Sequence, residues 1–89
     1  KKRKTMNEAA LKRIKEVLEL IVKELVDLPD KVQVRVNLGE QTAVFSIKVD
    51  QSELGKVIGR QGKIVGALRT LLGSFSVRAG GRAVIEIEE

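Results

Sequence analysis

The stretch that most constrains the fold is residues 54–72, where two apolar segments flank Gly59, Arg60, Gln61 and Gly62. Two glycines three residues apart permit a tight turn, positive φ angles and close approach of another molecule. After the turn, apolar residues recur at intervals of three and four, which predicts a helix that begins at the second glycine. The unpaired N–H groups and dipole at such a helix N-terminus favour an anion. We therefore expect two helices joined by a phosphate-binding turn.

The charge distribution agrees with that expectation. The net charge is +5, but residues 1–4 supply four of the positive charges, so the rest of the chain is nearly neutral. Residues 54–72 carry four basic residues and no acid, and Lys56, Arg60 and Lys63 surround the turn. Stronger phosphate motifs are excluded, since Val57 and Ile64 replace the Gly and Ser or Thr of a Walker A loop, and no G-x-G-x-x-G occurs. The bare G-x-x-G spacing is weak, so its context carries the argument.

Composition excludes several classes of function. The 89 residues suffice for one domain, and with only two aromatic residues its core must be mainly Val, Ile and Leu. The chain has no Cys and no His, so we expect no disulfide, no metal site and no cofactor. We also expect no enzyme, because no serine has an evident base beside it and Asp27 and Asp30 fit turn and capping roles. Without an apolar stretch of membrane-spanning length or a secretory segment, the expected compartment is the cytoplasm.

The order of elements predicts an α+β fold. Residues 1–4 are expected to form a basic disordered arm, either adding phosphate affinity or serving only as a terminal tail. One domain then spans 5–89, with a helix at 5–28 capped by Thr5, a hairpin at 31–49, the helix-turn-helix at 51–79 and a strand at 82–88. This α-β-β-α-α-β order predicts a three-stranded mixed sheet with the helices on one face, because a helical crossover joins parallel strands.

The long helix after the turn should present two faces. We expect its sheet-facing side to consist of Ile64, Leu68, Leu71, Leu72 and Phe75. The opposite side would then hold Gly66, Arg69, Thr70, Gly73 and Val77, and all of these except Arg69 form a strip of small residues. A strip of small residues lets a second helix approach closely, which predicts a homodimer or a heterodimer. The alternative is an exposed face on a monomer.

The segment 57–63, Val-Ile-Gly-Arg-Gln-Gly-Lys, is similar to the V-I-G-x-x-G-[KR] signature of the KH domain. The element order resembles the type II, prokaryotic arrangement. Residues 17–88 further resemble the small single-KH bacterial RNA-binding proteins (KhpA-like), through the helix that ends at Pro29 and the closing strand. The chain departs from that group in a longer N-terminal helix and arm, and in Gly66, where a helix-favouring residue would be expected.

This resemblance implies a non-catalytic protein that grips about four nucleotides of single-stranded RNA, or of single-stranded DNA. It also implies RNA chaperone activity. The residues implied are Lys56, Val57, Ile58, Gly59, Arg60, Gln61, Gly62, Lys63 and Ile64. Ile58, Ile64 and Val65 would offer apolar surface to the bases. The resemblance also implies self-association or pairing with another KH-containing protein. The alternative function is a KH-fold interaction or dimerisation subunit with little RNA binding of its own.

Overall fold

An apolar stripe at helical spacing builds the first helix, α1 (Glu8–Leu25), in the computed structural model, which describes residues 6–89. The helix begins three residues later than the predicted 5–28 segment because Asn7 is its N-cap, and Asn7 Oδ1 accepts a hydrogen bond from Ala10 N at 2.8 Å. It ends at Leu25 since Val26 is extended and Pro29 opens the 3-10 turn η1 (Pro29–Lys31). The predicted basic arm and the Thr5 cap lie outside the described residues.

Three strands form the sheet, in the order β1 (Gln33–Leu38), β2 (Thr42–Lys48) and β3 (Arg82–Ile87). The hairpin makes β1 and β2 antiparallel, and the helical crossover makes β2 and β3 parallel. In this register Phe45 lies between Val36 and Ile85, so apolar residues of all three strands share one face. The prediction of a mixed three-stranded sheet in an α+β fold is confirmed.

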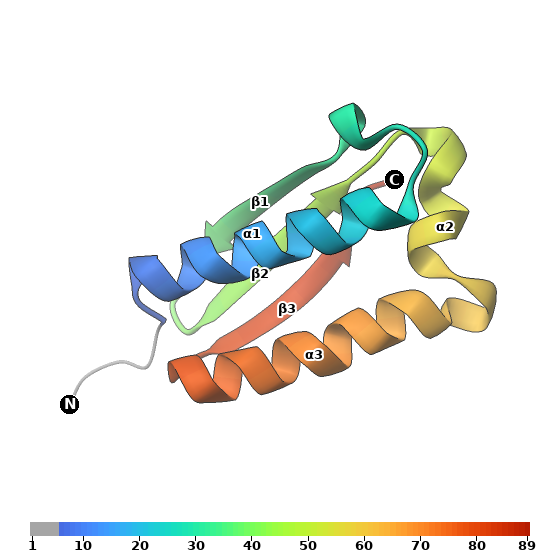
Figure 1. Cartoon of the computed structure of the whole chain (residues 1–89). Coiled ribbons are helices and arrows are strands. Elements are labelled where there is room, and N and C mark those ends of the chain that lie inside the picture. The colour runs from blue at the N-terminus through green and yellow to red at the C-terminus, as the bar shows by residue number, and fades with distance from the viewer. Residues whose placement is uncertain (1–5) are drawn as a thin grey trace.

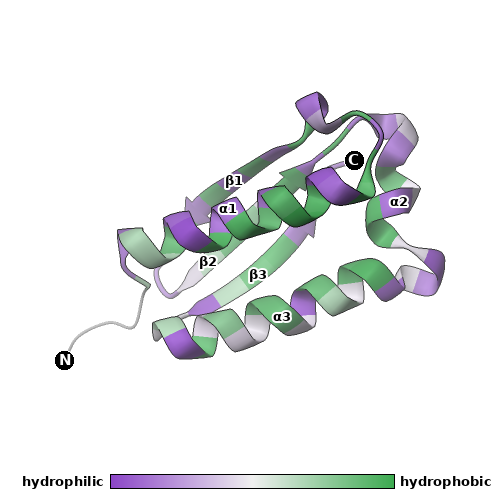
Figure 2. Ribbon diagram, in the orientation of Figure 1, coloured by the Kyte–Doolittle hydropathy of each residue, from purple (hydrophilic) through white to green (hydrophobic). Residues whose placement is uncertain are grey.

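The helices lie against that apolar face of the sheet, with α1 and α3 (Lys63–Ala79) side by side and α2 (Leu54–Ile58) at one end (Figure 1). Hydrophobic and hydrophilic residues alternate along α1, as expected for a helix with one buried side (Figure 2). The short 3-10 turns η2 (Gln51–Glu53) and η3 (Arg60–Gly62) precede α2 and α3. The largest fully buried side chains are Leu18, Val22, Phe45, Ile47, Val57 and Leu72.

The buried side of α3 differs in part from the prediction. Val65, Leu68, Leu72 and Ser76 are buried, whereas Leu71 is 44% exposed and Ile64 and Phe75 are half-buried. The intervals between the buried residues are three, four and four, so these residues form one stripe along the helix, and Leu71 lies beside that stripe. Ser76 is accommodated there because its Oγ donates to Gly73 O at 2.9 Å. Leu71 consequently lies at the margin of the core.

Candidate nucleic-acid interface

The turn between α2 and α3 contains three residues with positive φ within a stretch of four. Gly59 has φ 81° and ψ 167°, Gln61 has φ 57°, and Gly62 has φ 75°. Two hydrogen bonds hold the turn, from Gly59 N to Gly55 O at 2.8 Å and from Gly62 N to Gly59 O at 3.0 Å. The predicted positive φ angles are therefore present at both glycines. Arg60 and Gln61, at the tip, are both exposed.

The two glycines are required for different reasons. A Cβ atom at Gly59 would lie 2.6 Å from Ile64 Cγ1 and 2.8 Å from Ile64 N, so the loop packs directly against the first turn of α3. A Cβ atom at Gly62 would meet nothing within 4 Å. Gly59 thus allows the loop to close on its own helix, while the backbone at Gly62 stands open to an incoming molecule.

The N-terminus of α3 is open as well. Gly62 is the N-cap, and no side chain among residues 6–89 caps the helix there. Lys63 N bonds to Arg60 O, which leaves the next N–H groups of the first turn directed outward along the helix axis. Arg60 and Lys63 are exposed, and neither forms an ion pair within the described part of the chain. The start of α3 therefore combines uncapped backbone donors with two exposed cations that have no ion-pair partner in this part of the chain, which is the composition of a candidate anion site.

Lys56, the third cation predicted beside the turn, differs from Arg60 and Lys63 because it is ion-paired. Its Nζ lies 2.9 Å from Asp27 Oδ2 and 3.3 Å from Glu53 Oε2. The hydrogen bond to Asp27, followed by that to Glu53, raises the pKa of Lys56 above its ordinary value. Because the folded-state pKa is raised, these contacts stabilise the fold at neutral pH and are lost only as pH rises through that pKa. Lys56 is thus paired with two carboxylates while its own side chain stays about half exposed.

Glu53 is a residue whose role the sequence did not reveal. Its carboxylate, only 3% exposed, accepts hydrogen bonds from the backbone N–H groups of Asp27 and Leu28, the latter at 3.0 Å. The carboxylate thereby ties the segment after α1 to the start of α2, which leads into the turn. No local sequence signal marks a contact between residues 25 or 26 positions apart.

The apolar residues near the turn divide into buried and accessible ones. Val57 is fully buried, so its side chain anchors α2 in the core instead of reaching a ligand. Val65 is 7% exposed, and the expectation that it offers surface to bases is wrong, since it points into the core. Ile58 and Ile64 are half-buried and remain accessible beside the loop.

The predicted small-residue strip is largely on the surface. Gly66 and Thr70 are exposed, and Thr70 Oγ1 donates to Gly66 O at 3.1 Å. Val77 is 80% exposed, and Gly73 is half-buried with nothing within 4 Å of a Cβ atom placed there. Arg69 turns towards the sheet, where a guanidinium nitrogen donates to Ile85 O at 3.4 Å. Arg69 therefore packs along the outer strand β3 instead of joining an outward strip.

Two further kinds of feature are absent from residues 6–89. No helix of this part of the chain has the length and apolar character needed to span a membrane. No group of three or more His, Cys, Asp or Glu side chains there is placed to hold a metal ion.

Comparison with known proteins points to one family. The model of the KhpA/KhpB KH domain matches residues 15–87. The RNA-binding protein KhpA of Aquifex aeolicus (strain VF5) is 51% identical over 76 residues, which cover 85% of this chain and 96% of that protein. The proteins of the same name from Clostridium acetobutylicum and Borreliella burgdorferi are 46% and 44% identical, over 83% and 81% of this chain and 99% and 88% of theirs.

The fold also matches a solved structure of another protein. A crystal structure of an Era variant from Aquifex aeolicus, bound to GDP and aluminium fluoride, superposes with a TM-score of 0.58 at 15% sequence identity. The match covers 84% of this chain and 29% of the Era chain. At that identity the likeness concerns the fold.

Proposed function

The chain belongs to the KhpA/KhpB KH-domain family, and on that premise we propose that it is a non-catalytic protein that binds single-stranded RNA at the turn between α2 and α3. The relatives named above are RNA-binding proteins by name, which supports the ligand class. The observation that carries the proposal is the open N-terminus of α3, where uncapped N–H groups face outward beside Arg60 and Lys63.

Each residue of the turn has a role in this proposal. A phosphate of the strand lies against the first N–H groups of α3, and the open side of Gly62 lets the nucleic-acid backbone come close. Arg60, Gln61 and Lys63 contact neighbouring phosphates, whereas the ion pairs of Lys56 and the buried side chain of Val57 support the turn. Ile58 and Ile64 give apolar surface to the bases of about four nucleotides.

Modest sequence preference follows from the composition of this site. Neither phenylalanine of the chain lies in the turn, and the chain has no Trp or Tyr, so aromatic stacking is not available there. Phosphate contacts then supply most of the affinity, which weakens as salt concentration rises. On the same reasoning single-stranded DNA binds too, less tightly where a 2′-hydroxyl is contacted.

The test replaces the tip of the turn. We expect the double variant Arg60→Asp, Gln61→Asp to lose RNA binding by about a hundredfold or more, because two carboxylates would repel the phosphate at the helix N-terminus. Both side chains are exposed, so circular dichroism and the unfolding midpoint should stay near the wild-type values. Binding is measured by fluorescence anisotropy with a short labelled single-stranded RNA.

The matched control carries the same change in charge at a distance from the turn. Lys23→Glu with Gln41→Glu alters two exposed positions, on α1 and in the hairpin turn. This control should lose affinity no more than a few-fold, through the general field of the protein. Equal losses in both double variants, or full affinity in the Arg60 and Gln61 variant, would rule out the turn as the binding site.

Assembly forms a second part of the proposal. The chain pairs with a copy of itself, or with another KH-containing protein, through the outer face of α3. The exposed Val77 and the open space over Gly66 and Gly73 support it, because they let a second helix approach. The same observation favours the alternative function, an interaction subunit with little RNA binding of its own. The RNA measurement above separates the two functions.

A further inference from the structure

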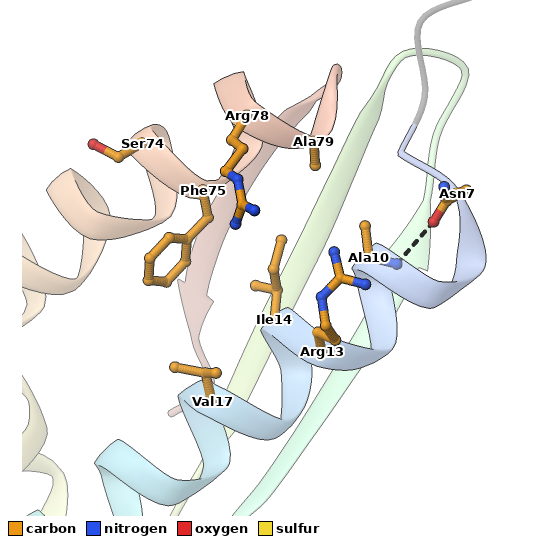
Figure 3. Close-up of a pocket in the computed structure, with 9 residues that line it drawn as sticks. All are labelled: Asn7, Ala10, Arg13, Ile14, Val17, Ser74, Phe75, Arg78 and Ala79. Atoms are coloured by element: carbon orange, nitrogen blue, oxygen red, sulfur yellow. Dashed lines mark hydrogen bonds between the residues drawn. The ribbon is translucent and has the colours of Figure 1, made fainter.

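A groove lies between the N-terminal half of α1 and the C-terminal half of α3, at the end of α3 remote from the turn (Figure 3). Its volume is about 630 Å³. The apolar part of its lining comes from Ala10, Ile14 and Val17 of α1 and from Phe75 and Ala79 of α3. Val17 is 39% exposed and Phe75 is half-buried. The groove thus offers a hydrophobic and aromatic floor that solvent can reach.

Two arginines line this groove, one from each helix. Arg13 projects from α1 and Arg78 from α3, and the guanidinium groups extend towards each other over Ile14 (Figure 3). Both residues are exposed, and within residues 6–89 neither forms a hydrogen bond or an ion pair. None of the residues that line the groove is acidic. Two like charges facing each other without a counter-charge make a site complementary to an anion.

A row of side chains links this groove to the turn. Ile64, Leu71, Phe75 and Arg78 follow one another at intervals of seven, four and three residues, so they lie along one side of α3. The row begins at the turn, because Ile64 packs against Gly59. It includes Leu71, which the core leaves 44% exposed. Since α3 has 17 residues, its two ends are about 25 Å apart.

From these observations we propose that the groove between α1 and α3 is a second RNA contact, which binds the continuation of the strand held at the turn. Arg13 and Arg78 bind one phosphate, and Phe75 provides a surface for one base. This inference rests on the proposed function. The apolar row and the aromatic floor favour a nucleic acid over an acidic peptide, since bases can use both while the arginines neutralise the backbone.

The test compares RNA length in one pair of variants. Wild-type protein should bind a single strand of about twelve nucleotides at least tenfold more tightly than one of about four. Arg13→Gln with Arg78→Gln should remove most of that advantage and leave the affinity for the short strand within about twofold of wild type. The salt dependence for the long strand should also fall, by a slope of about 0.7, because the two arginines together neutralise one phosphate.

The control is Lys12→Gln with Lys23→Gln, which removes the same charge from exposed positions of α1 that do not line the groove. It should preserve the preference for the long strand. A groove variant that keeps the full preference, or that weakens both strands equally, overturns the inference. So does a variant that loses affinity for an oligoglutamate peptide while binding both RNAs as wild type does. If wild-type protein binds neither RNA, both the proposed function and this inference fail. If it binds the short strand but the groove variant behaves like the wild type, only the inference about the groove fails.

Discussion

The two proposed anion sites, at opposite ends of α3, are built from different groups. At its N-terminus the backbone forms the site, through positive φ angles at Gly59 and Gly62 and through uncapped N–H groups. At its C-terminal end side chains form it, through Arg13 and Arg78 reaching from separate helices. A backbone site depends on conformation and fails when the turn cannot form. A side-chain site depends on packing between helices and fails when charges are removed.

The largest expected effect comes from adding a methyl group to the backbone-built end. Gly59→Ala should destabilise the protein by about 3 kcal/mol, because φ 81° with ψ 167° is open essentially to glycine only and because Cβ would collide with Ile64. Urea unfolding measures the loss, and RNA affinity should fall with it. Gly62→Ala is the comparison, with φ 75° in the left-handed region and no collision, and should cost about 1 kcal/mol. Equal costs at the two glycines would show that packing on Ile64 does not matter.

A smaller effect is expected from the residue that supports the turn from behind. Glu53→Gln should destabilise the protein by about 2 kcal/mol. The buried carboxylate accepts hydrogen bonds from the N–H groups of Asp27 and Leu28, and in the variant an amide NH₂ group would face one of these donors. Thermal unfolding followed by circular dichroism is the measurement. Glu24→Gln, on the exposed surface of α1, should change stability by no more than about 0.5 kcal/mol. If the Glu53→Gln protein were as stable as the wild type, the contact of Glu53 with residues 27 and 28 would not be needed to hold the turn in place.

The smallest effect should appear midway along α3, where neither end is disturbed. Gly73→Glu should stabilise the monomer fold by somewhat under 1 kcal/mol, since glycine disfavours the interior of a helix and space is open at this position. If the outer face of α3 joins two copies, the same change should dissociate the dimer, which light scattering detects. Gly73→Ala is the control, with the gain in helix propensity but little added bulk. A wild-type protein that is monomeric at high micromolar concentration, or a Gly73→Glu protein that stays dimeric, contradicts this interface.

The contrast between the two ends also explains what the sequence could predict. The turn is encoded locally, so the spacing of Gly59 and Gly62 and the helix that follows were sufficient to predict the positive φ angles and the open helix N-terminus. The order of elements was enough for the mixed sheet. Contacts between distant segments could not be predicted in this way, as for the contact of Glu53 with residues 27 and 28.

The same limit applies to individual side chains. Lys56 was predicted to contact RNA because it is close to the turn in sequence, but its ion pair with Asp27, 29 positions away, could not be foreseen. Arg13 and Arg78 are 65 positions apart, so their meeting in one groove depends on how α1 and α3 pack. The prediction that Leu71 faces the sheet was wrong for a related reason, since this residue is 44% exposed. Helical spacing shows that residues share a stripe, but not which of two adjacent stripes the sheet covers.

The contact between Glu53 and the segment after α1 determines how the binding turn can be engineered. Residues 51–79 contain the turn and both flanking helices, and they resemble a portable cassette for grafting onto another scaffold. Transplanted by itself, that cassette would carry Glu53 without the amides of residues 27 and 28 that satisfy its carboxylate. The recipient protein would have to supply two backbone N–H donors at the same position, or Glu53 would have to be replaced. The smallest unit suited to transfer therefore begins at α1.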